Sequence, residues 1–203
     1  MTVEKGVDWG GALPAPEDIV VVATDAEARA AIAGPWRAGR PLPAVGLLGG
    51  DLCRTLGGRG GDGDRLRRDG TGATVDLGVA TLDGERHVFV AHLVARRSWW
   101  RGRVVAIMNA QFLGAWDVAP RAHPGDGRLD VVDADLVLGD RWKARTRLPS
   151  GTHVPHPGIA QTRTARWTTT FARPTPVRLD GEVVATARTL EVTVEPDALQ
   201  VVV

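Results

Sequence analysis

The chain has 203 residues, and at ~150 residues per domain it forms one domain or two small ones. Hydrophobic residues make up 43% and charged residues 24%, which excludes wholesale disorder. The balance of 25 Lys and Arg against 24 Asp and Glu does not favour a general nucleic-acid binder. Because Cys53 is the single cysteine, an intramolecular disulfide and a multi-Cys metal site are also excluded.

Neither a secretory signal nor a membrane span is expected. Residues Met1 to Gly10 carry acidic residues and no apolar core. The longest apolar runs, such as Ile19 to Ala23, are far shorter than the ~20 residues of a transmembrane helix. We therefore expect a cytoplasmic protein, and the sequence does not indicate its oligomeric state.

Residues 18–57 are typical of alternating strand and helix. The β-branched run Asp18 to Ala23 predicts a buried parallel strand, and Ala26 to Ala33 predicts a helix that Thr24 or Asp25 caps and Gly34-Pro35 ends. A second strand is expected over Pro43 to Leu48. A short helix over Leu52 to Leu56 should follow it, with Asp51 as its cap and Gly57-Gly58 as its end. We interpret residues 1–58 as a reduced α/β, Rossmann-like lobe.

The rest of the chain divides at a polar segment. Residues 59–73 combine Gly, Asp and Arg without apolar periodicity, which predicts a loop or linker. From residue 74 the chain consists of short alternating segments, with Asp83-Gly84 and Asp180-Gly181 as hairpin turns. Residues 74–203 should therefore form an antiparallel β-sandwich, which makes the fold class α+β. Strands are expected at Val75 to Leu82, His87 to Val94, Arg103 to Met108, Gly127 to Leu138, Thr164 to Phe171, Pro176 to Leu179, Glu191 to Val194 and Leu199 to Val203.

Three ordered motifs resemble one known family. They are Asn109 to Gly114 followed by a P-x-A-x-x-x-D-G-x-L-D-V pattern over Pro120 to Val131, the P-V-x-x-D-G-E hairpin over Pro176 to Glu182, and a closing segment from Pro196. In order and spacing they resemble the diacylglycerol kinase-like lipid kinases of the NAD kinase-like superfamily, from about residue 45 to the C-terminus. The resemblance implies the two-part fold of that family and ATP-dependent transfer of phosphate to a lipid hydroxyl.

The resemblance also implies roles for single residues. It places a structural Mg²⁺ on the Asp-Gly loop, with the His123 carbonyl, the Asp126 carboxylate and the Arg128 carbonyl as ligands. On the residues alone, a plain Asp-Gly turn without metal is the preferred interpretation, and Asp130 is either an alternative ligand or only a turn residue. The resemblance makes Glu182 the general base, whereas on sequence alone it is a solvated turn residue.

The nucleotide side departs from the family pattern. Gly46 to Gly57 resembles G-T-G-N-D-[FL]-A-R-x-L-G but lacks its Thr and Asn, so Gly49, Gly50 and Asp51 form a degenerate nucleotide site. The G-G-D-G-T phosphate loop is replaced by Thr24 to Ala28, where Ala side chains block the approach of a phosphate. Asp25 and Glu27 would repel a triphosphate. The family's first strands are absent or replaced by Met1 to Glu17, so the lobe is interpreted as a remnant.

Several functions are consistent with these features. We expect a catalytically impaired lipid kinase-like protein, a pseudoenzyme that binds a lipid, a membrane-surface substrate or a partner protein. The alternatives are an active lipid kinase whose donor site is altered or completed by another subunit, and a β-sandwich interaction module without ligand. The basic aromatic cluster Ser98 to Arg101, with Arg96, Arg97 and Arg103, either contacts lipid headgroups or packs its Trp pair beneath the sandwich. Cys53 is expected to be a buried structural thiol.

Overall fold

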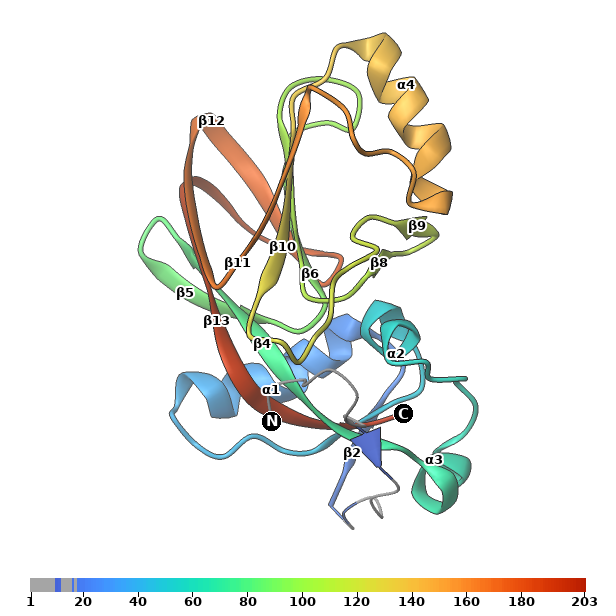
Figure 1. The fold of residues 1–203 in the computed structure, drawn as a ribbon. Helices are drawn as coiled ribbons and strands as arrows, with labels where there is room; N and C mark the ends of the chain where they lie inside the picture. Colours follow the sequence, from blue (N-terminus) through green and yellow to red (C-terminus); the bar gives the residue numbers. More distant parts are fainter. Residues whose placement is uncertain (1–9, 12–15, 17) are drawn as a thin grey trace.

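The computed structural model describes residues 10–11, 16 and 18–203. The expectations for Met1 to Glu17 fall mostly outside this described part. Within it the chain is mostly sheet with few helices (Figure 1). The α-helices are α1 (Asp25–Arg37), α2 (Gly50–Thr55), α3 (Gly63–Asp69) and α4 (Leu138–Arg147), and the 3₁₀ helix η1 spans Leu148–Ser150.

The strands are β1 (Gly10–Gly11), β2 (Val20–Val22), β3 (Val45–Leu47), β4 (Gly72–Leu82), β5 (Glu85–Phe89), β6 (His92–Arg96), β7 (Val104–Met108), β8 (Phe112–Leu113), β9 (Trp116–Asp117), β10 (Leu129–Ala134), β11 (Ile159–Thr164), β12 (Arg166–Leu179) and β13 (Glu182–Val202). Among the described residues, eleven of them form one sheet with the path β1-β4-β13-β12-β6-β7-β10-β11. β5 pairs with β4, and β3 and β2 continue the sheet beyond β13. β8 and β9 form a separate hairpin.

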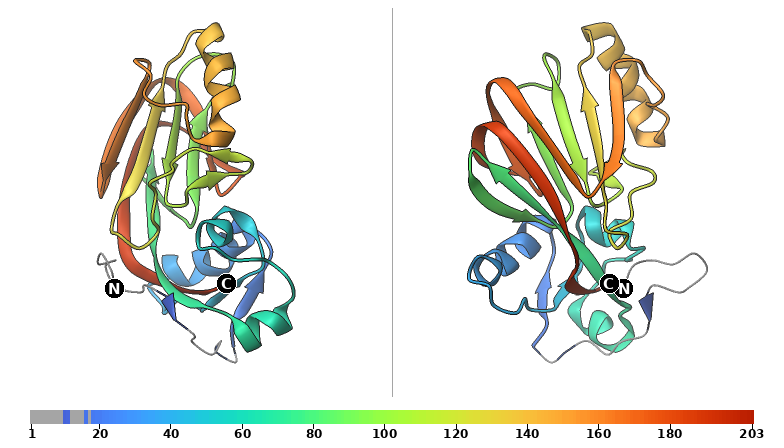
Figure 2. Two further views of the ribbon diagram at one scale, coloured as in Figure 1. Left: turned by 45° about the vertical axis from the view of Figure 1, so that its right-hand side comes forward. Right: turned by 60° about the vertical axis from the view of Figure 1, so that its left-hand side comes forward.

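The long strand β13 links the N-terminal part of the chain to the rest. It pairs antiparallel with β12 and β4, and at Val201–Val202 it pairs parallel with β3. The bend at Glu195–Leu199, where Asp197 has a φ of 51°, separates the part of β13 that pairs with β12 from the part that pairs with β3. Figure 2 shows β13 running the length of the molecule, with α1, α2 and α3 at one end and α4 at the other.

The sheet curls around its own hydrophobic core. Phe89 of β5, Ile107 of β7 and Leu190 of β13 belong to one buried cluster, so strands distant along the sheet path face one another across it. This part is sandwich-like, as the alternating segments predicted. The hairpin turns at Asp83-Gly84 and Asp180-Gly181 are present, and all four residues have positive φ.

Several local predictions are wrong. The single strand expected over His87 to Val94 is divided into β5 and β6. Residues 63–69 of the expected loop form α3, because Asp62 caps it and Leu66 is buried against Ile19 and Val202. α1 continues through Gly34-Pro35 to Arg37, where Trp36 packs on the core and donates a hydrogen bond to Glu195. α2 begins at Gly50, with Gly49 rather than Asp51 as its cap. The strand expected to reach Leu138 ends at Ala134, and the helix α4 follows it.

Candidate functional site

The two strand-to-helix turns of the N-terminal part are joined by a buried carboxylate. Asp25, 6% exposed at the start of α1, accepts hydrogen bonds from the backbone N–H groups of Asp51 (2.6 Å) and Leu52 (3.2 Å) at the start of α2. Glu27 similarly accepts a hydrogen bond from Ala23 N–H at 2.7 Å. Burial raises the pKa of Asp25 to about 6, despite the opposing hydrogen bonds.

The glycines between β3 and α2 allow this close approach. A Cβ on Gly50, whose φ is +94°, would lie 2.5 Å from an Asp25 carboxylate oxygen. A Cβ on Gly49 would lie 2.6 Å from the carbonyl oxygen of Ala23. The structure therefore explains both glycines by the packing of one turn on the other. The nucleotide role expected for Gly49, Gly50 and Asp51 remains a prediction.

Asp51 forms the next part of a polar network. Its carboxylate lies 3.0 Å from His92 Nε2 and accepts a hydrogen bond from Gly114 N–H at 2.9 Å. Burial alone would raise the pKa of Asp51. The hydrogen bonds from His92 and Gly114 outweigh burial and hold this pKa below its usual value. Burial alone would lower the pKa of His92. The hydrogen bond with Asp51 and the nearby charge of Asp180 outweigh burial and raise this pKa.

Asp180 and Glu182 lie on the other side of His92. The Asp180 carboxylate is fully buried and accepts hydrogen bonds from the N–H groups of Val90 (3.0 Å), Ala91 (2.8 Å) and His92 (3.1 Å). Arg29 of α1 lies 3.8 Å from Asp180 and forms an ion pair with the more exposed Glu182. Burial raises the pKa of Asp180.

The structure thus brings Asp51 and Glu182, both predicted from sequence, to one network. Its other members are Asp25, Arg29, His92 and Asp180. From the sequence, Asp25 was expected as a candidate helix cap and as a charge that repels phosphate, and Asp180 as a turn residue. It assigned no role to Arg29 or His92, because their partners come from distant segments.

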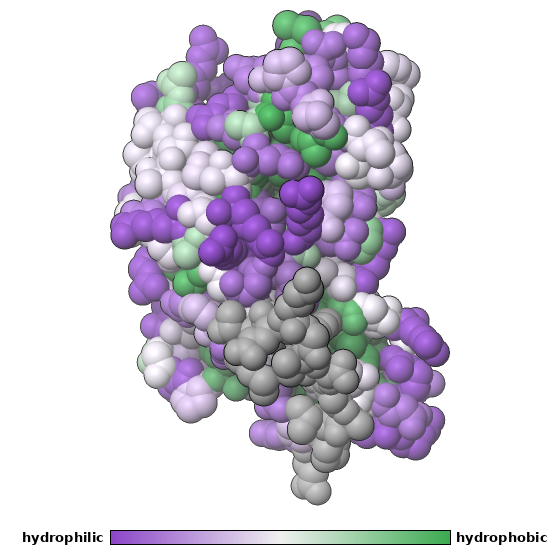
Figure 3. Space-filling view, viewed as in Figure 1, coloured by the Kyte–Doolittle hydropathy of each residue, from purple (hydrophilic) through white to green (hydrophobic). Residues whose placement is uncertain are grey.

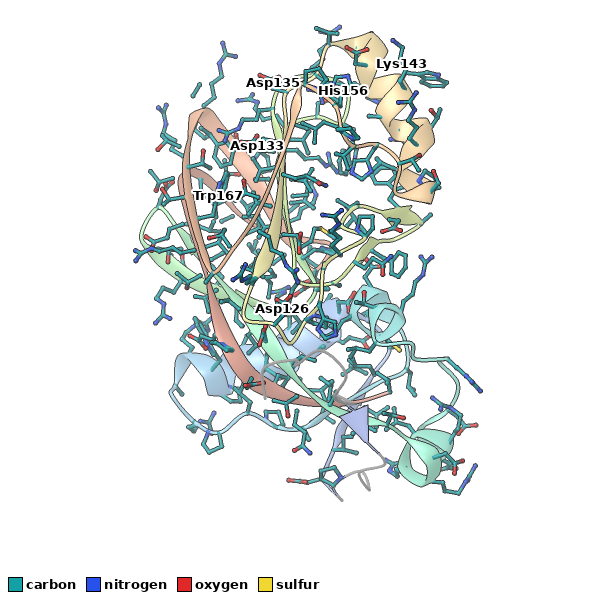
Figure 4. All side chains as sticks on the ribbon, viewed as in Figure 1. Asp126, Asp133, Asp135, Lys143, His156 and Trp167 are labelled. Atoms are coloured by element: carbon teal, nitrogen blue, oxygen red, sulfur yellow. The ribbon has the colours of Figure 1, made fainter. Side chains whose placement is uncertain are left out.

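The expected magnesium loop has a different arrangement. Asp126, at the lower end of β10 in Figure 4, forms an ion pair with Arg163 of β11 and accepts a hydrogen bond from Arg128 N–H at 3.0 Å. Arg163 stands opposite Asp130 in the β10–β11 ladder, and its Nε lies 3.6 Å from the Asp130 carboxylate. Both Asp126 oxygens are engaged, and a guanidinium supplies the local positive charge. Asp126 is therefore paired with Arg163, and the magnesium role expected for His123, Asp126 and Arg128 remains a prediction from which we derive no step.

We expect Arg163→Gln to lower the melting temperature, because Asp126 and Asp130 then lose their shared cation. The loss should be about 1 kcal/mol, since the Arg163 side chain is 38% exposed. Thermal unfolding with and without EDTA measures both this effect and any metal dependence. Arg166→Gln, which removes the exposed pair with Glu191, is the matched control and should change little. A lower melting temperature of the unmodified protein in EDTA would contradict this interpretation and favour the metal.

An apolar pocket lies between the sheet and α4. It has a cavity volume of about 100 Å³. Its walls are mostly hydrophobic or aromatic, and include Trp99, Trp100, Val104, Ala106, Leu113, Trp116, Val132, Leu136, Ala144, Leu148 and Ile159. A predominantly hydrophobic and aromatic lining of this kind is typical of small-molecule sites.

The α4 side of the pocket is fixed by a buried arginine. Arg141 donates hydrogen bonds to the carbonyl oxygens of Leu136 (2.7 Å), Trp99 (3.4 Å) and Gly102. At the pocket wall, Trp99 and Trp116 meet edge to face, with ring centroids 5.1 Å apart. Of the Trp pair expected to pack beneath the sandwich, Trp99 packs against a buried cluster of the sheet, whereas Trp100 is 42% exposed.

One hairpin joins the pocket to the polar network. Leu113 and Trp116 of β8–β9 line the pocket, while Gly114 between them donates its N–H to Asp51. Arg54 of α2 donates a hydrogen bond to the Gly114 carbonyl oxygen at 2.9 Å and stacks on Phe112. The hairpin that forms one wall of the pocket is therefore held by Asp51 and Arg54 of α2.

Comparisons with known proteins agree with this architecture. Residues 75–203 match the family described as YegS C-terminal NAD kinase beta sandwich-like domain. Three structures named as diacylglycerol kinases, from Bacillus anthracis str. Sterne, are similar in fold. Their TM-scores are 0.71, 0.68 and 0.65, at 13%, 13% and 14% identity. The matches cover 91% of this chain and 77%, 77% and 75% of those chains. No curated protein matches the chain by sequence.

Proposed function

The chain belongs to the YegS C-terminal NAD kinase beta sandwich-like domain family, and on this basis we propose that it binds a diacylglycerol-like lipid without transferring phosphate to it. The family membership confirms the resemblance to diacylglycerol kinase-like proteins. The observation that carries the lipid proposal is the apolar pocket under α4, which the β8–β9 hairpin links to the polar network around Asp51. An apolar pocket beside a polar network suits a lipid with apolar chains and a small hydroxyl head.

Two features support the absence of phosphate transfer. The N–H groups at the two turns, which a phosphate would need, already donate to Asp25 and Glu27. The two carboxylates also place negative charge where a triphosphate would lie. Catalysis of phosphoryl transfer depends on positioning and neutralising the phosphates, so a protein without that cradle loses most of the rate.

Glu182, the general base that the family resemblance implies, has a different role in this proposal. Glu182 forms an ion pair with Arg29, and its carboxylate must leave that pair before it accepts a proton from a lipid hydroxyl. We propose that Glu182 and Asp51 hold the polar head of the lipid through hydrogen bonds.

A titration with dihexanoylglycerol below its micellar concentration tests lipid binding. Trp99, Trp100 and Trp116 line the pocket, so the tryptophan fluorescence should change as it fills. Ala144→Phe fills the pocket from α4 and should weaken binding at least tenfold, or about 1.4 kcal/mol. Thr146→Phe, exposed on the same helix and outside the pocket, should bind as the unmodified protein does. Equal binding by both variants would contradict the proposed site.

We expect no ATP binding at millimolar concentration, because Asp25 and Glu27 occupy the turn N–H groups. Melting temperature measured against Mg²⁺-ATP concentration should stay constant. A dissociation constant below ~100 μM, roughly −5.5 kcal/mol, would instead favour an active kinase with an altered donor site.

A further inference from the structure

Exposed hydrophobic side chains gather at one end of the molecule. In the described part, four of the five large exposed ones lie on α4, just before it, or on the loop that touches it: Trp100 (42% exposed), Val137 (72%), Leu138 (61%) and Trp142 (62%). The Trp100 and Trp142 rings are stacked, with centroids 6.4 Å apart. Figure 3 shows hydrophobic side chains at the top of the molecule, over the region of α4 in Figure 1.

Basic side chains surround these four residues. Arg101, Lys143, Arg145 and Arg147 are exposed, and the acidic residues beside them are Asp135 and Asp140. Arg145 lies over the rings of Trp100 and Trp116, at 5.2 and 4.9 Å. Figure 4 shows Lys143 on α4, with Asp135 and His156 near the start of the helix. The cations outnumber the acids, so the surface carries a net positive charge.

We propose that this surface docks on a lipid bilayer that contains anionic lipid. It is defined by Trp100, Val137, Leu138 and Trp142 with Arg101, Lys143, Arg145 and Arg147, and is called the α4 face below. Tryptophan and leucine beside Arg and Lys are the composition of helices that lie in the interface of a membrane. Each basic residue near an anionic surface contributes further attraction.

The position of the pocket agrees with this orientation. Trp100, Leu136 and Arg145 line the pocket and also belong to, or adjoin, the α4 face. A lipid can then pass from the bilayer into the pocket without crossing water. This last point rests on the proposed function, whereas docking of the α4 face does not. No helix of the described residues combines the length and apolarity needed to cross a membrane.

Co-sedimentation with large unilamellar vesicles tests the docking. We expect binding to vesicles of phosphatidylcholine with a third of phosphatidylglycerol, and weaker binding to phosphatidylcholine alone or at high NaCl. The double variant Leu138→Ser/Trp142→Ser should lose binding at least tenfold. Val183→Ser, which removes the fifth exposed hydrophobic side chain, is the matched control and should bind normally. Lys143→Gln/Arg147→Gln should weaken binding to the anionic vesicles only.

Three outcomes would overturn the proposal: no binding to anionic vesicles, normal binding by Leu138→Ser/Trp142→Ser, or equal loss in Val183→Ser. A wild-type dimer that this double variant converts to a monomer, without vesicle binding, would assign the α4 face to self-association. The substituted side chains are all exposed, so each variant should melt close to the temperature of the unmodified protein. This measurement shows that the variants are folded. Dihexanoylglycerol titration without vesicles separates the two proposals, because the double variant should retain that binding even though it no longer docks.

Discussion

Asp180→Ala should destabilise the protein by about 3–5 kcal/mol, the range for loss of one partner from a buried charged network. The variant leaves the N–H groups of Val90, Ala91 and His92 buried without their acceptor. It also removes the carboxylate beside Arg29. Urea unfolding measures the loss.

Glu182→Gln, two residues away, is the matched control for Asp180→Ala. Its side chain is 62% exposed and its pair with Arg29 lies near the surface, so the change should stay within about 1 kcal/mol. A loss below about 1 kcal/mol in Asp180→Ala would show that the network does not hold the β5–β6 turn in place.

The contribution of Asp25 to the free energy of unfolding should fall as the pH rises from about 4 to about 6. Asp25 has a pKa raised by burial to about 6, from 3.8. Between these values the folded state binds a proton that the unfolded state has released, so Asp25 lowers stability by roughly 3 kcal/mol once the pH exceeds 6. The raised pKa of Asp180 acts in the same direction.

His92 and Asp51 affect the stability of the fold above and below this pH interval. The raised pKa of His92 stabilises the fold below 6.5, and this stability is lost as the pH rises further. Asp51, whose pKa is lowered, gives stability that is lost only in stronger acid. Melting temperatures across this pH range test the profile, and Asp25→Asn should flatten it between pH 4 and 6. An Asp25→Asn variant whose profile matches that of the unmodified protein would contradict the raised pKa of Asp25.

The β-rich part of the fold was predictable because its information is local. Alternating apolar residues and the Asp83-Gly84 and Asp180-Gly181 turns specify strands and hairpins without distant partners. α4 was missed for the opposite reason. Its sequence has little apolar periodicity, and it is held to the sheet through Arg141, a buried cation that binds three carbonyl oxygens. α3 likewise depends on one buried side chain, Leu66.

In the candidate site, too, local motifs were predictable from the sequence and contacts between distant segments were not. Motif resemblance led to Asp51 and Glu182, whose positions the structure brings to one network. The roles of Asp25 and Asp180 come from backbone N–H groups far along the chain, and sequence spacing carries no sign of such contacts. Gly49 and Gly50 illustrate the ambiguity, because a phosphate loop and a close turn both require glycine.

A phosphotransfer assay tests most directly whether lipid binding occurs without phosphate transfer. The protein, with dihexanoylglycerol at a concentration that saturates the tryptophan signal, is incubated with Mg²⁺ and γ-labelled ATP, and the lipid fraction is counted. We expect label no higher than in a reaction without protein, and no difference between the unmodified protein and Glu182→Gln. Labelled lipid that forms with the unmodified protein, and falls ~10²–10⁴-fold in Glu182→Gln, would show that the chain is a lipid kinase with Glu182 as its base.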